Sequence, residues 1–277
     1  MTEYYFAPLE GITGCLFRQV HHRHFPQMDR YFMPFLVPHE KRTFNGKELR
    51  EMDPENNKGI WVIPQIMTNK AEDFISTARK LQNRGYEEVN LNLGCPSKTV
   101  VSKGRGSGFL AYPEQLDAFL DQIFQKLDMK ISVKTRIGVE DEEEFGRLLE
   151  IYNHYPLSEL IIHPRLQRDQ YKFPIHMEIF DQAVKDSKNV LCYNGDLTMK
   201  EEVENFQKAF PGVERIMIGR GLLRNPGLVQ EMKTGQVLSK EQLREYHDDI
   251  YQVYQDTQCG ERNVLFRMKE LWGFMID

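Results

Sequence analysis

The chain lacks the features that mark membrane, secreted and disulfide-rich proteins. Its 277 residues contain no run of about 18 apolar residues, which a membrane-spanning helix requires. Residues 1–6 lack the basic and apolar regions of a secretory signal. Four cysteines occur, Cys15, Cys95, Cys192 and Cys259, and no two of them form a CxxC pair. This scattering argues against a disulfide framework or a zinc site, so we expect a cytoplasmic protein without a metal.

The sequence also lacks an excess of positive charge. Lys and Arg number 36 against 41 Asp and Glu, which gives a net charge of −5 at pH 7. A nucleic-acid site must therefore be a local basic patch on an acidic body. Charged residues make up 28% and apolar residues 40%, as in water-soluble globular proteins. The length suits one large domain with room for a small second one.

Apolar runs of strand length alternate with helical stretches along most of the chain. The patterns predict strands at 4–7, 30–37, 60–66, 88–93, 130–135, 159–163, 189–193 and 215–218. They predict helices at 14–25, 69–84, 113–126, 142–154, 176–188, 199–210 and 226–233, and a loop with at most one helix at 39–58. Asn69 is the expected N-cap of the second helix, and Gly85 is its expected stop.

Eight such strands predict an α/β fold, the (β/α)8 TIM barrel. An open doubly wound sheet is the alternative, but the GxGxxG turn that usually follows its first strand is absent. The alternation ends after Val237, and 239–255 and 263–275 have the pattern of two helices. We expect a barrel at residues 1–236 and a small helical domain at 237–277. The last segment is apolar and ends abruptly, so we expect this helical domain to be incomplete.

The stretch from Glu88 to Gly108 has the most unusual composition. Apolar residues alternate with Asn90 and Asn92, so one face of the predicted strand carries two amides. A buried amide without a partner costs about 1–3 kcal/mol, and a bound polar ligand would supply partners. Gly94 ends the strand, and Pro96 constrains the turn that carries Cys95. A structural cysteine at the end of a buried strand is the simpler interpretation.

Polar side chains follow the predicted strands, at the rim where a barrel holds its active site. Each one alone has an ordinary structural explanation, but seven polar strand ends around one rim indicate an active site. The last two ends, Asn194-Gly195-Asp196 and Gly219-Arg220-Gly221, follow strands seven and eight, where barrels commonly bind phosphate. Glycines there let backbone N–H groups approach the phosphate oxygens.

Seven motifs occur in the order found in a known enzyme family. They are Ala7-Pro8-Leu9-Glu10-Gly11, Leu91-Asn92-Leu93-Gly94-Cys95-Pro96-Ser97-Lys98, Gly104 to Leu110, Lys134-Thr135-Arg136-Ile137-Gly138, His163-Pro164-Arg165, Asn194-Gly195-Asp196 and Met217-Ile218-Gly219-Arg220-Gly221. Over about residues 5–230 the chain resembles the tRNA-dihydrouridine synthase family. The resemblance implies an FMN-binding barrel and a C-terminal helical domain that helps to hold tRNA. It also implies reduction of uridine in tRNA with NADPH as the reductant, and we expect a monomer.

The resemblance further implies roles for individual residues. Cys95 would be the general acid that protonates C5 of the uracil while reduced FMN delivers a hydride to C6. A cation beside the flavin ring would stabilise the anionic reduced flavin. The implied cofactor-binding residues are Ala7, Pro8, Leu9, Gln65, Asn92, Lys134, His163, Arg165, Asn194, Gly195, Asp196, Gly219 and Arg220. The loop after His163 keeps Tyr171-Lys172 but has Phe173-Pro174 where the family commonly has Gly.

Cations on two loops near Cys95 are candidates for RNA contacts, because phosphate contacts supply most non-specific affinity. They are Lys98, Lys103 and Arg105 after the fourth strand, and Arg165, Arg168 and Lys172 after the sixth. Solvated loop charges are the simpler interpretation. Two other functions stay open: a flavin barrel that acts on a small molecule, as dihydroorotate dehydrogenases do, and a tRNA-binding module that has lost its flavin.

Overall fold

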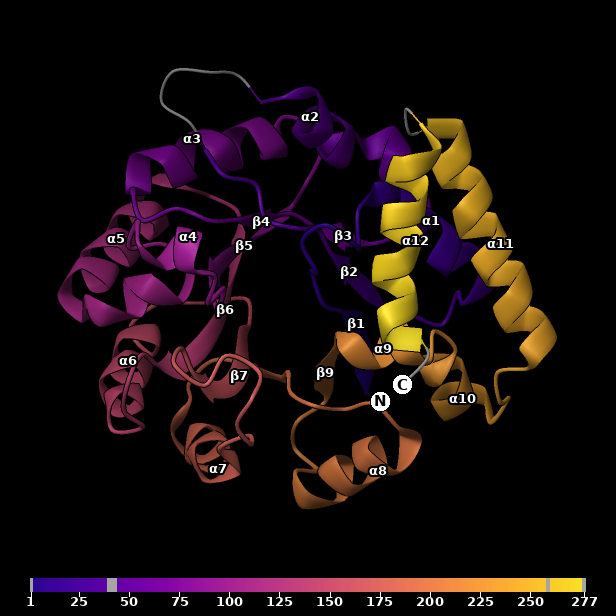
Figure 1. The fold of residues 1–277 in the computed structure, drawn as a ribbon. Coiled ribbons are helices and arrows are strands. Elements are labelled where there is room, and N and C mark those ends of the chain that lie inside the picture. The colour runs from indigo at the N-terminus through magenta and orange to yellow at the C-terminus, as the bar shows by residue number, and fades with distance from the viewer. Residues whose placement is uncertain (1, 39–43, 258–259, 276–277) are drawn as a thin grey trace.

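A parallel sheet forms the centre of the molecule (Figure 1). The computed structural model describes residues 2–38, 44–257 and 260–275. Within these ranges the sheet has nine strands in the order β3-β2-β1-β9-β8-β7-β6-β5-β4. The strands are β1 (Glu3–Phe6), β2 (Arg30–Phe32), β3 (Val62–Ile63), β4 (Gln65–Ile66), β5 (Glu88–Leu93), β6 (Lys130–Gly138), β7 (Leu160–Leu166), β8 (Leu191–Tyr193) and β9 (Arg215–Ile218).

The two ends of this strand order meet at Pro64. β3 pairs with β2, and β4, which follows directly after Pro64, pairs with β5. Proline has no N–H to donate to a neighbouring strand, so the predicted strand at 60–66 is broken in two. Because both pieces belong to one extended segment, they close the sheet into the predicted (β/α)8 barrel. The carboxyl ends of all strands therefore face one rim.

Helices surround the barrel, mostly where the sequence predicts them (Figure 1). They are α1 (Cys15–His24), α2 (Gly46–Met52), α3 (Ala71–Gln82), α4 (Lys98–Val101), α5 (Pro113–Lys126), α6 (Glu144–Tyr152), α7 (Met177–Asp186), α8 (Lys200–Ala209), α9 (Arg220–Arg224), α10 (Leu228–Thr234), α11 (Lys240–Thr257) and α12 (Glu261–Met275), with 3-10 helices η1 (Pro54–Asn57) and η2 (Gly106–Ala111). Among these helices, none combines the length and apolar character that a membrane crossing requires.

The predicted N-cap of α3 is wrong. Lys70 precedes this helix without a side-chain cap, and the amide of Asn69 instead donates to the carbonyl of Lys103, 3.1 Å away. The predicted loop at 39–58 contains α2 and η1, while residues 39–43 lie outside the described part. Cys15, Cys95 and Cys192 are free thiols, and Cys259 lies outside the described residues.

The last two helices pack against the barrel. α11 contacts α1, and α12 contacts α9 and α11 (Figure 1). Tyr246 of α11 is buried in a cluster of aromatic rings that includes Phe17 and Phe25. Asp249 accepts hydrogen bonds from His24 at 2.9 Å and from Arg23 at 3.3 Å. These contacts fix the helices over the side of the barrel formed by β1 and β2.

Candidate active site

A pocket of about 90 Å³ opens at the carboxyl ends of β1, β6, β7, β8 and β9. It contains most of the cofactor-binding residues that the sequence predicts, from five separate strand ends. Its lining consists of Ala7, Pro8, Leu9, Lys134, His163, Tyr171, Asn194, Gly195, Asp196, Leu197, Thr198, Met217, Ile218, Gly219, Arg220 and Gly221. The predicted residues Gln65, Asn92 and Arg165 are buried and do not line this pocket.

Cations outnumber carboxylates around the pocket. Asp196 accepts hydrogen bonds of 2.8 Å from Arg165 and from Arg220, and its second oxygen also contacts Arg165. Burial raises the pKa of Asp196, but the two guanidinium groups outweigh this effect and lower it. Within the described part of the chain, Nζ of Lys134 has no hydrogen-bond or ion-pair partner, and burial lowers the pKa of this ammonium to about 8. This charge balance suits an anionic ligand such as a phosphate.

His163 is neutral with its proton on Nδ1. Its Nε2 lies 3.2 Å from Nη1 of Arg165. A guanidinium can only donate, so Nε2 must accept and the proton of the neutral ring must be on Nδ1. Burial and the nearby cations Lys134 and Arg136 lower the pKa of His163 well below its ordinary value.

Arg136 and Tyr171 are site residues to which the sequence analysis assigned no role. The guanidinium of Arg136 donates to three carbonyls: Gly94 at 2.9 Å, Leu166 at 2.8 Å and Gln170 at 2.8 Å. Arg136 therefore connects the turn before Cys95 to the loop that carries Tyr171. The ring of Tyr171 stacks on His163, with a centroid distance of 5.9 Å, and lies 5.2 Å from the guanidinium of Arg136 and 4.9 Å from that of Arg220. The sequence offered a signal for each residue: Arg136 belongs to the family motif that begins Lys134-Thr135-Arg136, and Tyr171 belongs to the Tyr171-Lys172 pair that the loop keeps.

The amides of β5 find their partners within the protein. Nδ2 of Asn92 donates to Gln65 at 2.7 Å, Nε2 of Gln65 donates to Asn90 at 2.7 Å, and Nδ2 of Asn90 donates to Ser132 at 3.0 Å. A ligand is therefore not needed to supply partners for these amides. The register that places Gln65 opposite Asn90 builds this network. Gln65, which is fully buried, reaches the rim of the barrel through Asn92.

Cys95 lies on a turn that side chains and backbone fix from several directions. The backbone N–H of Cys95 donates a hydrogen bond of 3.0 Å to Oδ1 of Asn92. The carbonyl of Cys95 accepts two hydrogen bonds from Ser107, one of 3.1 Å from its backbone N–H and one of 2.9 Å from its Oγ. At Gly106, which has a φ of +55°, a Cβ would lie 2.7 Å from this carbonyl, so only glycine fits.

The surroundings of the Cys95 thiol favour its protonated form. Burial raises its pKa, and Glu10 adds to this effect, while the cations Arg136 and Lys134 act against it. Lys134 lies next to the turn, because a Cβ on Gly94 would be 3.9 Å from its Nζ. The turn of Cys95 and the cationic pocket are therefore neighbours.

The loop cations differ in how freely they can meet RNA. Lys98, Lys103 and Lys172 are exposed. Arg168 is also exposed and lies 3.9 Å from Glu140. Arg105 is half-buried, and among the described residues its Nε has no partner. The expectation that Arg165 is a free loop cation is wrong, because it is buried against Asp196.

Comparison with known proteins identifies the family. The family described as Dihydrouridine synthase (Dus) matches residues 5–267. A probable tRNA-dihydrouridine synthase of Staphylococcus aureus (strain COL) is 25% identical, covering 96% of this chain and 82% of the relative. A probable tRNA-dihydrouridine synthase 2 of Bacillus subtilis (strain 168) is 27% identical, covering 96% and 83%. The structure of morphinone reductase in complex with tetrahydroNAD shares the fold, with a TM-score of 0.60 and 12% identity over 86% of this chain and 88% of that one. The chain belongs to the dihydrouridine synthase family.

Proposed function

We propose that this protein reduces the C5–C6 double bond of specific uridines in tRNA, with FMN as the cofactor and NADPH as the reductant. Membership of the family supports the reduction of uridine, and the names of the Staphylococcus and Bacillus relatives support tRNA as the substrate. The observation that carries the proposal is the juxtaposition of the Cys95 thiol with the ammonium of Lys134, which has no partner among the described residues, beside a cationic pocket.

The residues around the pocket fit FMN. Gly195 and Gly219 line it without a side chain, and Arg220 adds positive charge that suits the phosphate. A Cβ on Gly219 would lie 3.4 Å from that of Ala7, which also lines the pocket, so a side chain would take space that the phosphate needs. Sites for whole ligands measure about 300–1,000 Å³, so this pocket of about 90 Å³ suits one end of the cofactor. Lys134 and His163 face the same space and would hold the ring system.

The side chains divide the chemistry between them. Reduced FMN, when bound, would supply the hydride that adds to C6 of the uracil. That addition develops negative charge at C5 and O4, and Cys95 donates the proton that completes the C5–H bond. Asn92 fixes the turn that holds the thiol, and Lys134 stabilises negative charge beside it.

RNA would be met by exposed cations on the same rim. We assign this role to Lys98, Lys103, Arg105, Arg168 and Lys172, together with the helical domain at 237–277. The target base must leave its stack to reach the site, as it does in other enzymes that act on a base. The cytoplasmic location and the monomeric state remain predictions.

Two measurements test the proposed function. The purified protein is expected to show a flavin absorption spectrum and to form dihydrouridine when incubated with NADPH and tRNA that lacks this modification. A colourless protein would favour a tRNA-binding module without flavin. A yellow protein that reduces orotate or free uracil but not tRNA would favour the small-molecule reductase.

A further inference from the structure

A larger cavity, of about 510 Å³, lies between the barrel and the C-terminal helices. Its lining comes from the loop after β1, from α1 and α2, from the segment after β2, and from α11 and α12. Leu16, Phe17, Leu36 and Tyr254 make much of the surface apolar, and Phe35 is half-buried among them. A cavity with this lining suits a flat, largely apolar group such as a nucleobase.

Two guanidinium groups of the cavity lining are available to an anionic ligand. Arg50 of α2 and Arg267 of α12 both line it, and neither guanidinium has a hydrogen-bond or ion-pair partner among the residues that the structure describes. The carboxylates of the lining are already engaged: Glu51 with Arg18, Glu10 with Lys47, and Glu48 with the backbone of Asn45. Arg50 and Arg267 are therefore the lining cations free to bind a phosphate, in a lining that carries three cations and three carboxylates.

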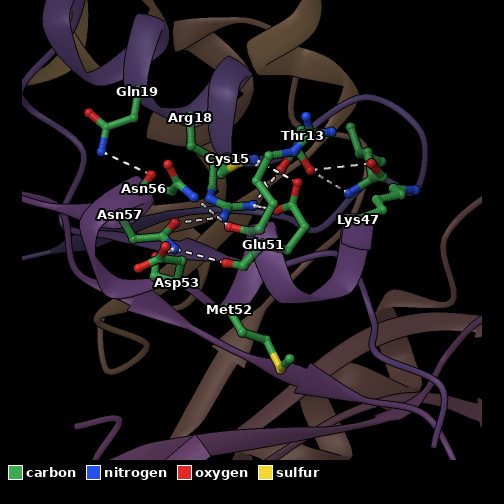
Figure 2. Close-up of polar contacts among 12 residues, drawn as sticks. Thr13, Cys15, Arg18, Gln19, Lys47, Glu51, Met52, Asp53, Asn56 and Asn57 are labelled. Atoms are coloured by element: carbon green, nitrogen blue, oxygen red, sulfur yellow. Dashed lines mark hydrogen bonds and ion pairs between the residues drawn. The ribbon is translucent and has the colours of Figure 1, made fainter. Parts of the chain in front are cut away.

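The wall that carries Arg50 is fixed to the barrel (Figure 2). Both carboxylate oxygens of Glu51 accept from the backbone N–H of Cys15, at 3.0 and 2.9 Å, and Oε2 also pairs with Arg18 at 3.0 Å. Arg18 in turn donates to Asn57 at 2.7 Å, so α2 and η1 are tied to the start of α1. All three side chains are buried. The backbone that carries Arg50 is therefore held in place, while its exposed side chain can turn towards a ligand.

The cavity adjoins the candidate active site. Leu9 lines the pocket at the strand ends, while Glu10 and Gly11, the next two residues, line the larger cavity. Consecutive Cα atoms are about 3.8 Å apart, so a single peptide unit lies between residues that line the two spaces. An RNA strand with its target uracil against the flavin bound at the first space would therefore bring a neighbouring nucleotide to the second.

We propose that this cavity binds the base of a nucleotide directly next to the target uridine, with Arg50 and Arg267 at its phosphates. The inference rests on the proposed function and adds a second nucleotide subsite to it. Proteins commonly read unstacked RNA bases by stacking them on aromatic side chains, and Phe35 is placed to do so. Arg50 and Arg267 supply positive charge for the phosphates of the RNA backbone.

The first experiment replaces both guanidinium groups. Arg50→Gln with Arg267→Gln is expected to raise KM for tRNA about tenfold with kcat unchanged, since binding is lost equally in ground and transition states. The slope of log affinity against log salt should fall by about 1.4, or about 0.7 for each lost phosphate contact. The matched control, Arg79→Gln with Arg147→Gln, removes the same charge from exposed positions on α3 and α6 outside the cavity and should change KM less than about twofold. Equal effects in both double variants, or an unchanged KM in the first, would overturn the inference.

The second experiment tests the base itself. Phe35→Ala is assayed on tRNA transcripts that lack the base on one or the other side of the target uridine. The rise in KM caused by Phe35→Ala should disappear on one of these two transcripts, because the base that stacks on Phe35 is already missing from it. If its cost stays the same on both, no neighbouring base occupies the cavity. FMN content and tRNA-independent NADPH oxidation should match the parent protein. If the parent itself forms no dihydrouridine in tRNA, the proposed function fails, and this inference fails with it.

Discussion

The side-chain oxygen of Asn92 accepts hydrogen bonds from the backbone N–H groups of Cys95, at 3.0 Å, and of Gly94, at 3.1 Å. The same amide donates to Gln65 from its nitrogen, at 2.7 Å. Gln65 of β4 thus positions Asn92 of β5, and Asn92 in turn positions the turn that carries the Cys95 thiol. The position of Cys95 depends on this buried chain of amides as well as on its own turn.

Replacing Asn92 should lower turnover far more than replacing Asn90, although both changes should destabilise the protein by a similar amount. Asn92→Ala is expected to lower kcat on tRNA by about a hundredfold, because a small displacement of a reacting group is costly. It should also destabilise the protein by about 1–3 kcal/mol, since Gln65 loses a buried partner. Asn90→Ala is the control: it removes bonds to Gln65 and Ser132 but touches neither Cys95 nor Gly94. Denaturant unfolding should show similar losses for both variants, and an equal loss of kcat in Asn90→Ala would contradict this account.

Gly195 and Gly219, two of the glycines that line the pocket, should respond differently to substitution. Neither glycine has a positive φ, and that of Gly219 is −111°, so the space around each added Cβ decides the outcome. Gly219→Val should therefore fold normally and purify with little FMN, because its side chain enters the pocket. At Gly195 a Cβ would lie 2.9 Å from both Ile175 Cδ1 and Tyr193 Oη, so Gly195→Val should lower the melting temperature as well. Flavin absorbance and thermal unfolding separate the two effects, and a fully yellow Gly219→Val protein would place the phosphate elsewhere.

Glu159, fully buried at the other end of the barrel, should make stability depend on pH. Burial and the nearby Glu88 raise its pKa to about 7, although Arg30 lies 3.2 Å and Arg215 3.6 Å from its oxygens. The folded protein then keeps a proton that the unfolded chain, with the ordinary glutamate pKa of 4.5, releases. The contribution of Glu159 to the free energy of unfolding is complete below pH 4.5. It is lost as the pH rises to about 7, which lowers the free energy of unfolding by about 3 kcal/mol.

The variant Glu159→Gln isolates this effect. The difference in unfolding free energy between parent and variant should shift with pH across this window, as measured by denaturant titration at several pH values. A constant difference would show that Glu159 stays ionised throughout.

The exposed lysines of the rim should contribute to RNA affinity through charge. Replacing Lys98, Lys103 and Lys172 with Gln is expected to weaken tRNA binding and to lower the salt slope by about 2, at about 0.7 for each lost contact with a single strand. FMN content should not change, because none of the three lines the pocket. Titrations of tRNA at several salt concentrations measure the slope, and an unchanged slope would leave these lysines as solvated charges.

The fold was predictable because its strands are apolar runs set between amphipathic helices. The break at Pro64 and the helix α9 were not predicted: the run at 60–66 is apolar on both sides of the proline, and five residues are too few to show a helical period. Asn69 has the residue type of an N-cap, but its amide serves a distant loop, and sequence alone does not reveal that contact.

The site was predictable where it depends on topology. Carboxyl ends of parallel strands meet at one rim, so Lys134, His163 and Asn194 were expected together and line one pocket. The partners of Asn90 and Asn92 depend on the register between β4 and β5, and the place of Tyr171 depends on a loop held by Arg136. Such contacts arise only from the three-dimensional arrangement.

The most direct test of the central claim is Cys95→Ala, followed in two half-reactions. The account predicts that NADPH reduces the bound flavin at the parent's rate, while formation of dihydrouridine in tRNA falls by about 10²–10⁴, the usual contribution of a positioned proton donor. A variant that modifies tRNA at the parent's rate would contradict the assignment of Cys95 as the general acid.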